Sequence, residues 1–188
     1  MEIKKLRILG ALEFSTQIFS DERGSFREWI NLEKIKREVD FSFPVIQGNI
    51  SHSKLGVIRG VHFSNSAKGQ GKFVTCISGK IVDVLVDLRL GSPTYLVKEY
   101  VYLDPTRAKS VYIPTGVGHG FASQEDDSVV CYLLTSEYDP ATEQTIYPFD
   151  VELGIDWNTK NSILSSRDSS AQTFAQAKAL NLLTSYQK

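Results

Sequence analysis

The chain has 188 residues, which is enough for one domain to bury most of its apolar surface. Its formal net charge of −1 and pI of about 6.3 leave no basic surface for neutralising many phosphates, so a nucleic-acid partner is not expected. Cys76 and Cys131 lie in apolar runs, which favours free thiols in a reducing, cytoplasmic compartment. Residues 1–14 lack the apolar core of a signal peptide, and we expect no membrane segment because no run approaches roughly 20 apolar residues.

Most of the chain consists of short apolar runs separated by turn residues. Residues 3–14 indicate an edge strand, and residues 25–30 a second strand. Asn31 is placed to cap a helix over residues 32–39. Further strands are expected over residues 45–51, 56–63, 72–78, 80–89, 95–103, 109–113 and 129–135, with a hairpin joining the runs on either side of Gly79. This pattern predicts an all-β sandwich or barrel.

The period of the pattern changes only in the tail. Phe174, Ala177, Leu180 and Leu183 recur every third residue, which predicts an amphipathic C-terminal helix over residues 171–186, packed on the sheet or on a partner. Repeats and linkers are not evident, so residues 1–188 are expected to form a single domain.

Residues 59–72 contain the first candidate site. In a regular strand Ile58, Gly60 and His62 would share one face, and Arg59 and Val61 the other. A glycine beside an imidazole leaves room for a ligand or for another backbone. The segment therefore suits a catalytic base, although a hydrogen-bonded core histidine would give the same pattern.

Residues 113–121 form a proline- and glycine-rich segment that brings His119 towards a barrel mouth, or else a tight loop with a surface histidine. The segment resembles the second half of the metal-binding signature of cupin barrels. The first half requires a His-x-His pair, but Phe63 and Ser64 follow His62. Two histidines are too few for a stable transition-metal site, so we expect a barrel without a metal.

Three further types of residue have both a structural and a functional interpretation. Tyr132 lies in a strand with alternating faces. Its hydroxyl either points into a site or forms a hydrogen bond with a buried partner. Asp168 is either a helix N-cap or a site carboxylate. Arg23, Arg59 and Arg167 lie near turns, where arginine is normally solvated but also suits bidentate contacts with phosphate.

Several spaced motifs occur in a fixed order and are more specific together than separately. They are Asp21-x-Arg23-Gly24-x-Phe26-x-Glu28, Gln47-Gly48-Asn49-x-Ser51, Arg59-Gly60-Val61-His62-Phe63, Gln70-Gly71-Lys72, Val86-Asp87-Leu88-Arg89-x-x-Ser92-Pro93-Thr94, Ile113-Pro114 with His119-Gly120-Phe121, Tyr132-x-x-Thr135-x-x-Tyr138-x-Pro140 and Leu164-Ser165-x-x-Asp168. Over about residues 12–168 they closely resemble the dTDP-4-dehydrorhamnose 3,5-epimerase family. The resemblance implies an all-β, cupin-like jelly-roll barrel with short peripheral helices, a homodimer with exchanged N-terminal strands, and no metal or organic cofactor.

The resemblance also implies roles for individual residues. His62 resembles the general base, Asp168 the carboxylate that orients it, Tyr132 the general acid, and Lys72 the cation beside the developing enolate. The implied substrate contacts are Arg59, His119 and Arg167 for the diphosphate (the last more often lysine in the family), Gln47, Gly48 and Asn49 for the sugar and phosphate region, Tyr138 for the thymine, Glu143 elsewhere on the substrate, and Arg23, Phe26 and Glu28 donated across the dimer.

The implied reaction converts dTDP-4-dehydro-6-deoxyglucose into dTDP-4-dehydrorhamnose by inverting C3 and C5. The ketone acidifies the protons on both flanking carbons, so an imidazole with a pKa of about 6.5 can remove one at neutral pH. The chain departs from the family pattern at Phe63, Ser64 and Asn158, where the family commonly has tyrosine, glutamine and proline. Epimerisation of one carbon on another deoxysugar nucleotide, or a non-catalytic sugar-nucleotide-binding jelly roll, therefore stays open.

Overall fold

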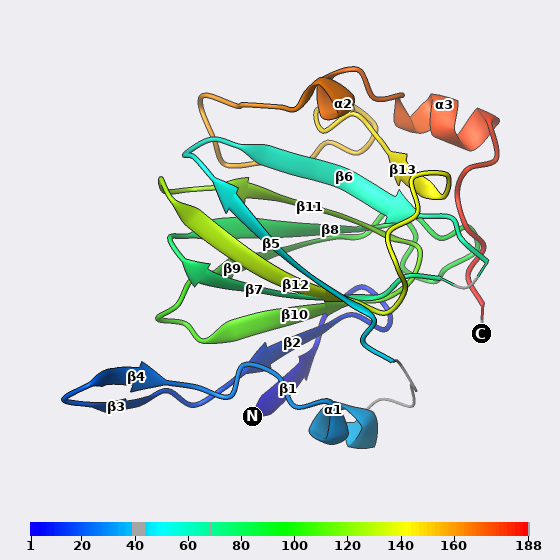
Figure 1. The fold of residues 1–188 in the computed structure, drawn as a ribbon. Coiled ribbons are helices and arrows are strands. Elements are labelled where there is room, and N and C mark those ends of the chain that lie inside the picture. The colour runs from blue at the N-terminus through cyan, green and yellow to red at the C-terminus, as the bar shows by residue number, and fades with distance from the viewer. Residues whose placement is uncertain (39–43, 68, 188) are drawn as a thin grey trace.

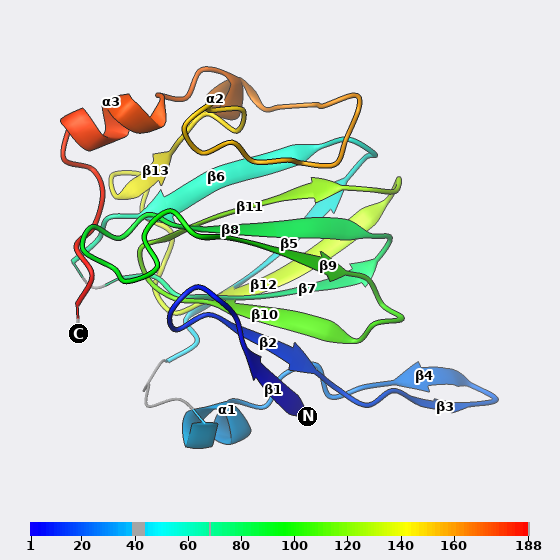
Figure 2. The same ribbon diagram turned by 180° about the vertical axis from the view of Figure 1, so that it is seen from behind.

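A computed structural model describes residues 1–38, 44–67 and 69–187, which form a jelly-roll barrel of two facing antiparallel sheets (Figures 1 and 2). One sheet has the order β1 (Glu2–Lys5), β2 (Leu12–Ser15), β10 (Lys109–Ile113), β7 (Lys72–Ser78), β12 (Ser128–Leu134) and β5 (Gln47–Ser53). The other has the order β13 (Glu143–Thr145), β6 (Ile58–Ser64), β11 (Val117–Ser123), β8 (Ile81–Asp87) and β9 (Lys98–Leu103). The predicted all-β jelly roll is confirmed. None of the described helices is long and apolar enough to cross a membrane.

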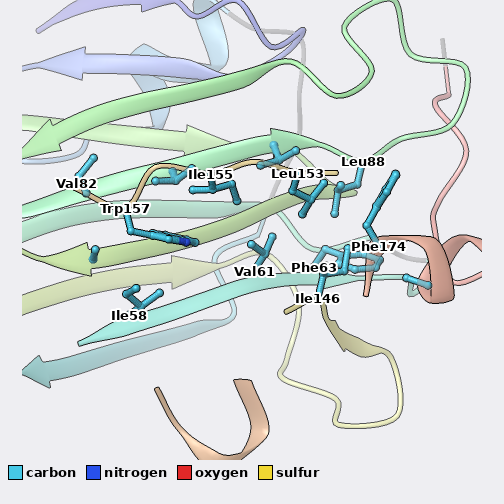
Figure 3. Packing of buried hydrophobic residues seen from close by; sticks show 14 of the residues in the cluster. Ile58, Val61, Phe63, Val82, Leu88, Ile146, Leu153, Ile155, Trp157 and Phe174 are labelled. Carbon is cyan, nitrogen blue, oxygen red and sulfur yellow. The ribbon is translucent and has the colours of Figure 1, made fainter. Parts of the chain in front are cut away.

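The five-stranded sheet is buried on both faces, which explains the nearly continuous apolar sequence of β8. On its outer face Val82 packs in a cluster with Trp157 and Phe174 (Figure 3). On its inner face Leu85 belongs to a second cluster that includes Val130 from the facing sheet. The sheet is therefore held between the barrel interior and the C-terminal third of the chain.

The outer face of the six-stranded sheet is partly covered by α1 (Leu32–Glu38). Ile35 of this helix is buried with Phe73 and Tyr112. The side-chain Oδ1 of Asn31 accepts a hydrogen bond from the Lys34 amide at 3.1 Å, which confirms the predicted cap. The expected last residue of the helix, 39, lies outside the described residues.

The N-terminal strand predictions need correction. Residues 3–14 form two strands, β1 and β2, because Gly10 adopts a φ of +86° and the chain reverses there. Of the strand expected over residues 25–30, only β4 (Gly24–Phe26) forms. It pairs with β3 (Phe19–Asp21) in a hairpin that projects from the barrel (Figure 1).

The predicted hairpin around Gly79 is wrong, because β7 and β8 belong to different sheets. Gly79 has a φ of +68°, and a Cβ there would lie 2.4 Å from Ser128 Oγ. The same hydroxyl accepts the Lys80 amide at 3.2 Å, so the chain turns a corner at this point. Alternation within a strand indicates which faces are buried but does not identify the neighbouring strand.

A strand was missed at β11, where a loop was expected. The strand was not predicted because it contains Gly118 and Gly120, and glycine has a low preference for strands. Their lack of a side chain is required by packing: a Cβ on Gly120 would lie 2.7 Å from the Trp157 ring. β11 lies between β6 and β8 and so reaches the centre of its sheet.

The C-terminal helix is shorter than the expected 171–186. α3 (Phe174–Ala179) is preceded by its N-cap Thr173, which forms a capping box with Gln176. It ends because Asn181 adopts a left-handed φ of 55° in a Schellman-type turn.

Beyond α3 the chain runs alongside Leu90. The Leu90 amide donates to the Thr184 carbonyl at 2.8 Å, and the Tyr186 amide donates to the Leu90 carbonyl at 2.9 Å. Leu183 is buried in this segment, whereas Leu180 is 63% exposed. The three-residue spacing therefore combined residues of α3 with residues of the segment that follows it. The packing of the tail on the sheet was predicted correctly.

A buried ion pair joins three distant segments. The Asp87 carboxylate accepts hydrogen bonds from Arg89 Nε at 2.8 Å and from Ser92 Oγ at 2.6 Å. Arg89 also donates to the Leu9 carbonyl at 2.8 Å and lies over the Tyr186 ring. Burial raises the pKa of Asp87, but its hydrogen bonds outweigh that effect and hold the pKa below its usual value.

Asp87→Asn should lower the free energy of unfolding at pH 7 by about 3 kcal/mol, because it leaves the Arg89 guanidinium buried without a counter-charge. Urea unfolding at several pH values measures this. Since the folded-state pKa of Asp87 is depressed, its stabilisation is present above the unfolded pKa and is lost as pH falls through the folded pKa. Asp21→Asn, on the exposed hairpin, is the control and should leave stability unchanged. Equal stability of Asp87→Asn and wild type at pH 7 would contradict the ion-pair role.

Candidate active site

A cavity of about 820 Å³ lies inside the barrel, a volume typical of small-molecule sites. Strands β5, β7 and β12 contribute to its lining from one sheet, and β6, β11 and β13 from the other. Residues 163–168, which lead into α2 (Ser166–Ser169), complete the lining. The predicted site residues that line it are Gln47, Gly48, Asn49, Arg59, His62, Lys72, His119, Tyr132, Tyr138, Glu143, Arg167 and Asp168.

A bulge in β6 changes the expected faces of this strand. Arg59 and His62 both line the cavity, whereas simple alternation placed them on opposite sides with Val61 beside Arg59. Two residues separate Arg59 from His62, but only Gly120 separates their register partners on β11. Val61 consequently packs in the outer apolar cluster.

His62 and Asp168 form a close pair. Their Nε2 and Oδ1 atoms are 2.6 Å apart, and the His62 side chain is 25% exposed. Burial raises the pKa of Asp168, but hydrogen bonds with His62 and Ser165 outweigh it and lower the pKa. The ionised carboxylate accepts the proton on Nε2, which leaves Nδ1 as the basic nitrogen of a neutral imidazole.

The position of Asp168 is fixed by the N-cap of α2. Ser165, rather than Asp168, caps α2, since its hydroxyl accepts the Asp168 amide at 3.0 Å. The interpretation of Asp168 as an ordinary N-cap is therefore wrong. The cap leaves the Asp168 carboxylate available to His62.

His119 belongs to a second histidine–carboxylate pair. It lies beside His62 in the β6–β11 register, and its Nε2 is 2.7 Å from Oδ1 of the fully buried Asp83. The alternative of a surface histidine in a loop is therefore wrong. Sequence reasoning gave Asp83 no role, although a carboxylate within the apolar run of β8 was a usable signal of a buried polar partner.

Lys72, at the start of β7, is a buried residue of the cavity lining. Its Nζ lies 3.8 Å from Glu143 Oε1. Burial lowers the pKa of Lys72, and the negative charges of Glu143 and Asp83 oppose that effect. The Lys72 amino group is thus held where water is scarce and carboxylates are near.

Tyr132 lines the cavity from β12, in the sheet opposite the one that carries His62. Burial raises the pKa of the Tyr132 phenol, while the positive charge of Arg59 and the nearby Asn49 side chain act in the other direction. The phenol therefore stays protonated at neutral pH. A proton donor and a proton acceptor consequently occupy facing walls of one cavity.

The remaining cavity residues include exposed groups and apolar walls. Arg167 Nη1 lies 3.3 Å from the Tyr138 hydroxyl, and Arg167 Nη2 donates to the Glu143 carbonyl at 3.1 Å. Lining residues to which the sequence analysis gave no role are Ile50, Val57, Ile58, Gln70, Phe121, Val130, Leu134, Ile163, Leu164 and Ser165. Most are apolar residues, so only the fold distinguishes them from the core.

Arg23, Phe26 and Glu28 lie apart from the cavity lining of their own chain, in the part that the structure describes. Arg23 pairs with Asp21 on the projecting hairpin. Glu28 lies 2.9 Å from Lys34 Nζ, and Phe26 is 70% exposed. In a single chain, these three side chains are exposed to solvent.

Within residues 1–38, 44–67 and 69–187, groups of three or more His, Cys, Asp or Glu side chains suited to a metal ion are absent. His62 and His119 each bond to a carboxylate instead.

The fold and the cavity define a jelly-roll barrel protein with a small-molecule site in its interior. A family model described as dTDP-4-dehydrorhamnose 3,5-epimerase matches residues 5–176. The chain belongs to this isomerase family, as its motifs predicted.

Individual relatives match this chain over almost its whole length. A dTDP-4-dehydrorhamnose 3-epimerase of Streptomyces niveus is 41% identical, covering 99% of this chain and 90% of the relative. A dTDP-4-dehydrorhamnose 3,5-epimerase of Mycobacterium tuberculosis is 38% identical, covering 100% and 95%. A crystal structure of a 3′-monoepimerase from Streptomyces bikiniensis in complex with dTDP-quinovose matches with a TM-score of 0.92 and 40% identity, covering 96% and 92%.

Glu143→Gln should lower the pKa of Lys72 further, because it removes the carboxylate 3.8 Å from Nζ. Acylation of Lys72 at a series of pH values, read by mass spectrometry of the labelled peptide, reports this pKa. Glu13→Gln is the matched control, since it removes a carboxylate 2.8 Å from another lysine, Lys109, and should leave Lys72 unchanged. Identical Lys72 titrations in wild type and Glu143→Gln would show that the pair is not coupled.

Proposed function

We propose that this protein inverts C3 and C5 of dTDP-4-dehydro-6-deoxyglucose to give dTDP-4-dehydrorhamnose, without a cofactor. The observation that carries the proposal is that His62 and Tyr132 line the same cavity from facing sheets. Inversion of a carbon requires a proton to leave from one face and return to the other. A base and an acid on opposite walls meet that requirement.

In the proposed reaction, Nδ1 of His62 removes the proton from a carbon next to the ketone. The electron pair of the broken C–H bond forms the enolate, and the negative charge develops on the former ketone oxygen. Lys72 stabilises this oxygen in a cavity where water is scarce. Tyr132 then donates its proton to the carbon from the opposite face, and Asp168 stabilises the imidazolium. The His62 imidazolium then releases its proton to solvent and the Tyr132 phenolate takes one up, and a second round at the other flanking carbon completes the conversion.

Binding of the nucleotide is assigned to the more exposed cavity residues. Arg59 and Arg167 offer guanidinium groups to the diphosphate, with His119 beside them, and the Tyr138 ring is available to stack on the thymine. These contacts hold the sugar between acid and base, which lowers the entropic part of the barrier. Gln47, Gly48, Asn49 and Glu143 complete the proposed sugar and phosphate contacts.

Epimerisation at C3 alone is the second candidate, and the names of two relatives at 40–41% identity favour it. The family departure at Phe63 does not decide between the two, because Phe63 packs in the outer apolar cluster. Ser64 is likewise buried, and its hydroxyl accepts the Ser66 amide at 3.2 Å.

The reaction is tested by NMR of dTDP-4-dehydro-6-deoxyglucose in heavy water. Wild type should exchange and invert both C3 and C5, whereas exchange at C3 alone would establish the single-carbon reaction. His62→Ala should abolish exchange, because it removes the base. Tyr132→Phe should lower inversion by about a hundredfold while partly sparing exchange, because it removes the returning proton. Absence of exchange in the wild type would refute the epimerase proposal and leave a binding protein.

We also propose a homodimer in which N-terminal strands are exchanged. β1 and β2 pair within one chain, so the segment available for exchange is the β3–β4 hairpin. Strands this short are marginally stable alone, and Phe19 and Phe26 are 54% and 70% exposed. Ile50, 73% exposed on β5, offers a second copy an apolar surface. Arg23, Phe26 and Glu28 would then reach the partner's cavity.

Subunit mixing tests this donation. His62→Ala and the double variant Arg23→Ala/Phe26→Ala should each be impaired, since one lacks the base and the other the donated contacts. After mixing under conditions that exchange subunits, activity should recover, because half of the mixed dimers' sites combine an intact cavity with an intact hairpin. Light scattering confirms the dimer. A monomeric protein, or a mixture no more active than its components, would refute the donation.

A further inference from the structure

We infer that the Tyr138 hydroxyl and the Glu143 backbone carbonyl hold the Arg167 guanidinium in place as a preformed ligand for the diphosphate. The inference rests on the proposed function, in which Arg167 contacts the diphosphate and the Tyr138 ring stacks on the thymine. It gives Tyr138 a second role as a positioning residue, which it performs through its hydroxyl and not through its ring.

Two hydrogen bonds from different nitrogen atoms fix the plane of the Arg167 guanidinium. Nη1 donates to the Tyr138 hydroxyl oxygen at 3.3 Å, and Nη2 donates to the Glu143 carbonyl at 3.1 Å. The direction of both bonds follows from the chemistry, because a guanidinium carries donors only. All three residues line the cavity, so the oriented group lies at its wall.

Each of the three residues is attached to a fixed part of the fold. The Tyr138 amide donates to Gln47 Oε1 on β5 at 2.8 Å. Glu143 begins β13, which pairs with β6. Arg167 lies in α2, whose N-cap is Ser165. The guanidinium therefore connects three segments that are already held by their own hydrogen bonds.

The two anchors orient Arg167 without neutralising it, because a hydroxyl and a backbone carbonyl are uncharged acceptors. The Glu143 carboxylate lies 3.8 Å from Lys72 Nζ. The carboxylate of Asp168 lies 2.6 Å from His62 Nε2. The positive charge of Arg167, and the N–H groups that the anchors do not use, are therefore available to a diphosphate.

This arrangement depends on arginine at position 167, where the family more often has lysine. The donors of a lysine radiate from one nitrogen atom and offer no planar fork to a phosphate. An anchored guanidinium has already lost rotamer freedom, so binding the diphosphate costs less conformational entropy. The next residue, Asp168, holds His62, so one turn of α2 positions both the diphosphate and the base.

A double-mutant cycle measured with dTDP tests the inference. Tyr138→Phe keeps the aromatic ring and removes only the hydroxyl, so the Kd for dTDP should rise about fivefold. Arg167→Met removes the charge and both donors and should raise the Kd at least about tenfold. In the Arg167→Met background, Tyr138→Phe should have no further effect, because the hydroxyl then has no guanidinium to hold. Calorimetry measures these constants, and ligand-observed NMR serves where binding is weak.

Kinetics in heavy water separate positioning from catalysis. In Tyr138→Phe the KM for dTDP-4-dehydro-6-deoxyglucose should rise with the Kd, whereas exchange at saturating substrate should keep the wild-type rate. The reason is that His62 and Asp168 keep their contact. Tyr102→Phe is the matched control, since it removes the hydroxyl of a tyrosine on β9 that is 41% exposed, against 48% for Tyr138. This control should change neither the Kd nor the KM.

The outcomes separate this inference from the proposed function. If Arg167→Met binds dTDP as tightly as the wild type, or the wild type does not bind it, the proposed diphosphate contact is wrong and the inference is overturned with it. If Arg167→Met binds weakly but Tyr138→Phe binds normally, or costs the same in both backgrounds, or slows exchange at saturation, the positioning role alone is overturned. A loss in Tyr138→Phe that disappears in the Arg167→Met background supports it.

Discussion

The close approach of β6 and β11 at Gly60 and Gly120 determines which side chains reach the cavity. A Cβ on Gly60 would lie 2.5 Å from the Cα of Gly120, and the φ of Gly60 is +141°. The two backbones can touch only because both positions are glycine. The bulge at this contact directs Arg59 and His62 inward together. Without it, regular alternation would place His62 and Arg59 on opposite faces of the sheet.

The cavity is organised by carboxylates that are paired with nitrogen groups. Asp168 holds His62, Asp83 holds His119, and Glu143 lies near Lys72. Removing such charges from water is costly, so each pair must offset its desolvation by close contact. The pairs keep the nitrogen groups in place before a substrate arrives, which is the preorganisation that electrostatic catalysis requires.

The sequence was sufficient for the fold class and for most of the cavity, but for different reasons. Period-two runs indicated many strands, whereas His62 and Tyr132 were found only because their motifs occur in a family order. Pairing between distant strands was not predictable from the sequence. The glycines of β11 weaken its strand pattern, and they are needed only because residues far along the chain pack against them. The bulge that turns Arg59 inward is equally a product of the β11 register. Asp83 was overlooked because its partner, His119, is reached only once β8 and β11 are neighbours.

The corner at Gly79 has a consequence for how the protein is made. It separates β7 from β8, so β7 takes its partners from β10 and β12, and β5 pairs with β12. On the ribosome, β5 and β7 therefore emerge well before the strand that lies between them. Long-range pairing of this kind folds slowly and leaves strand edges open to aggregation. Synthesis that stops before residue 128 would yield an aggregation-prone fragment, because its six-stranded sheet would lack β12, the strand that joins β7 to β5.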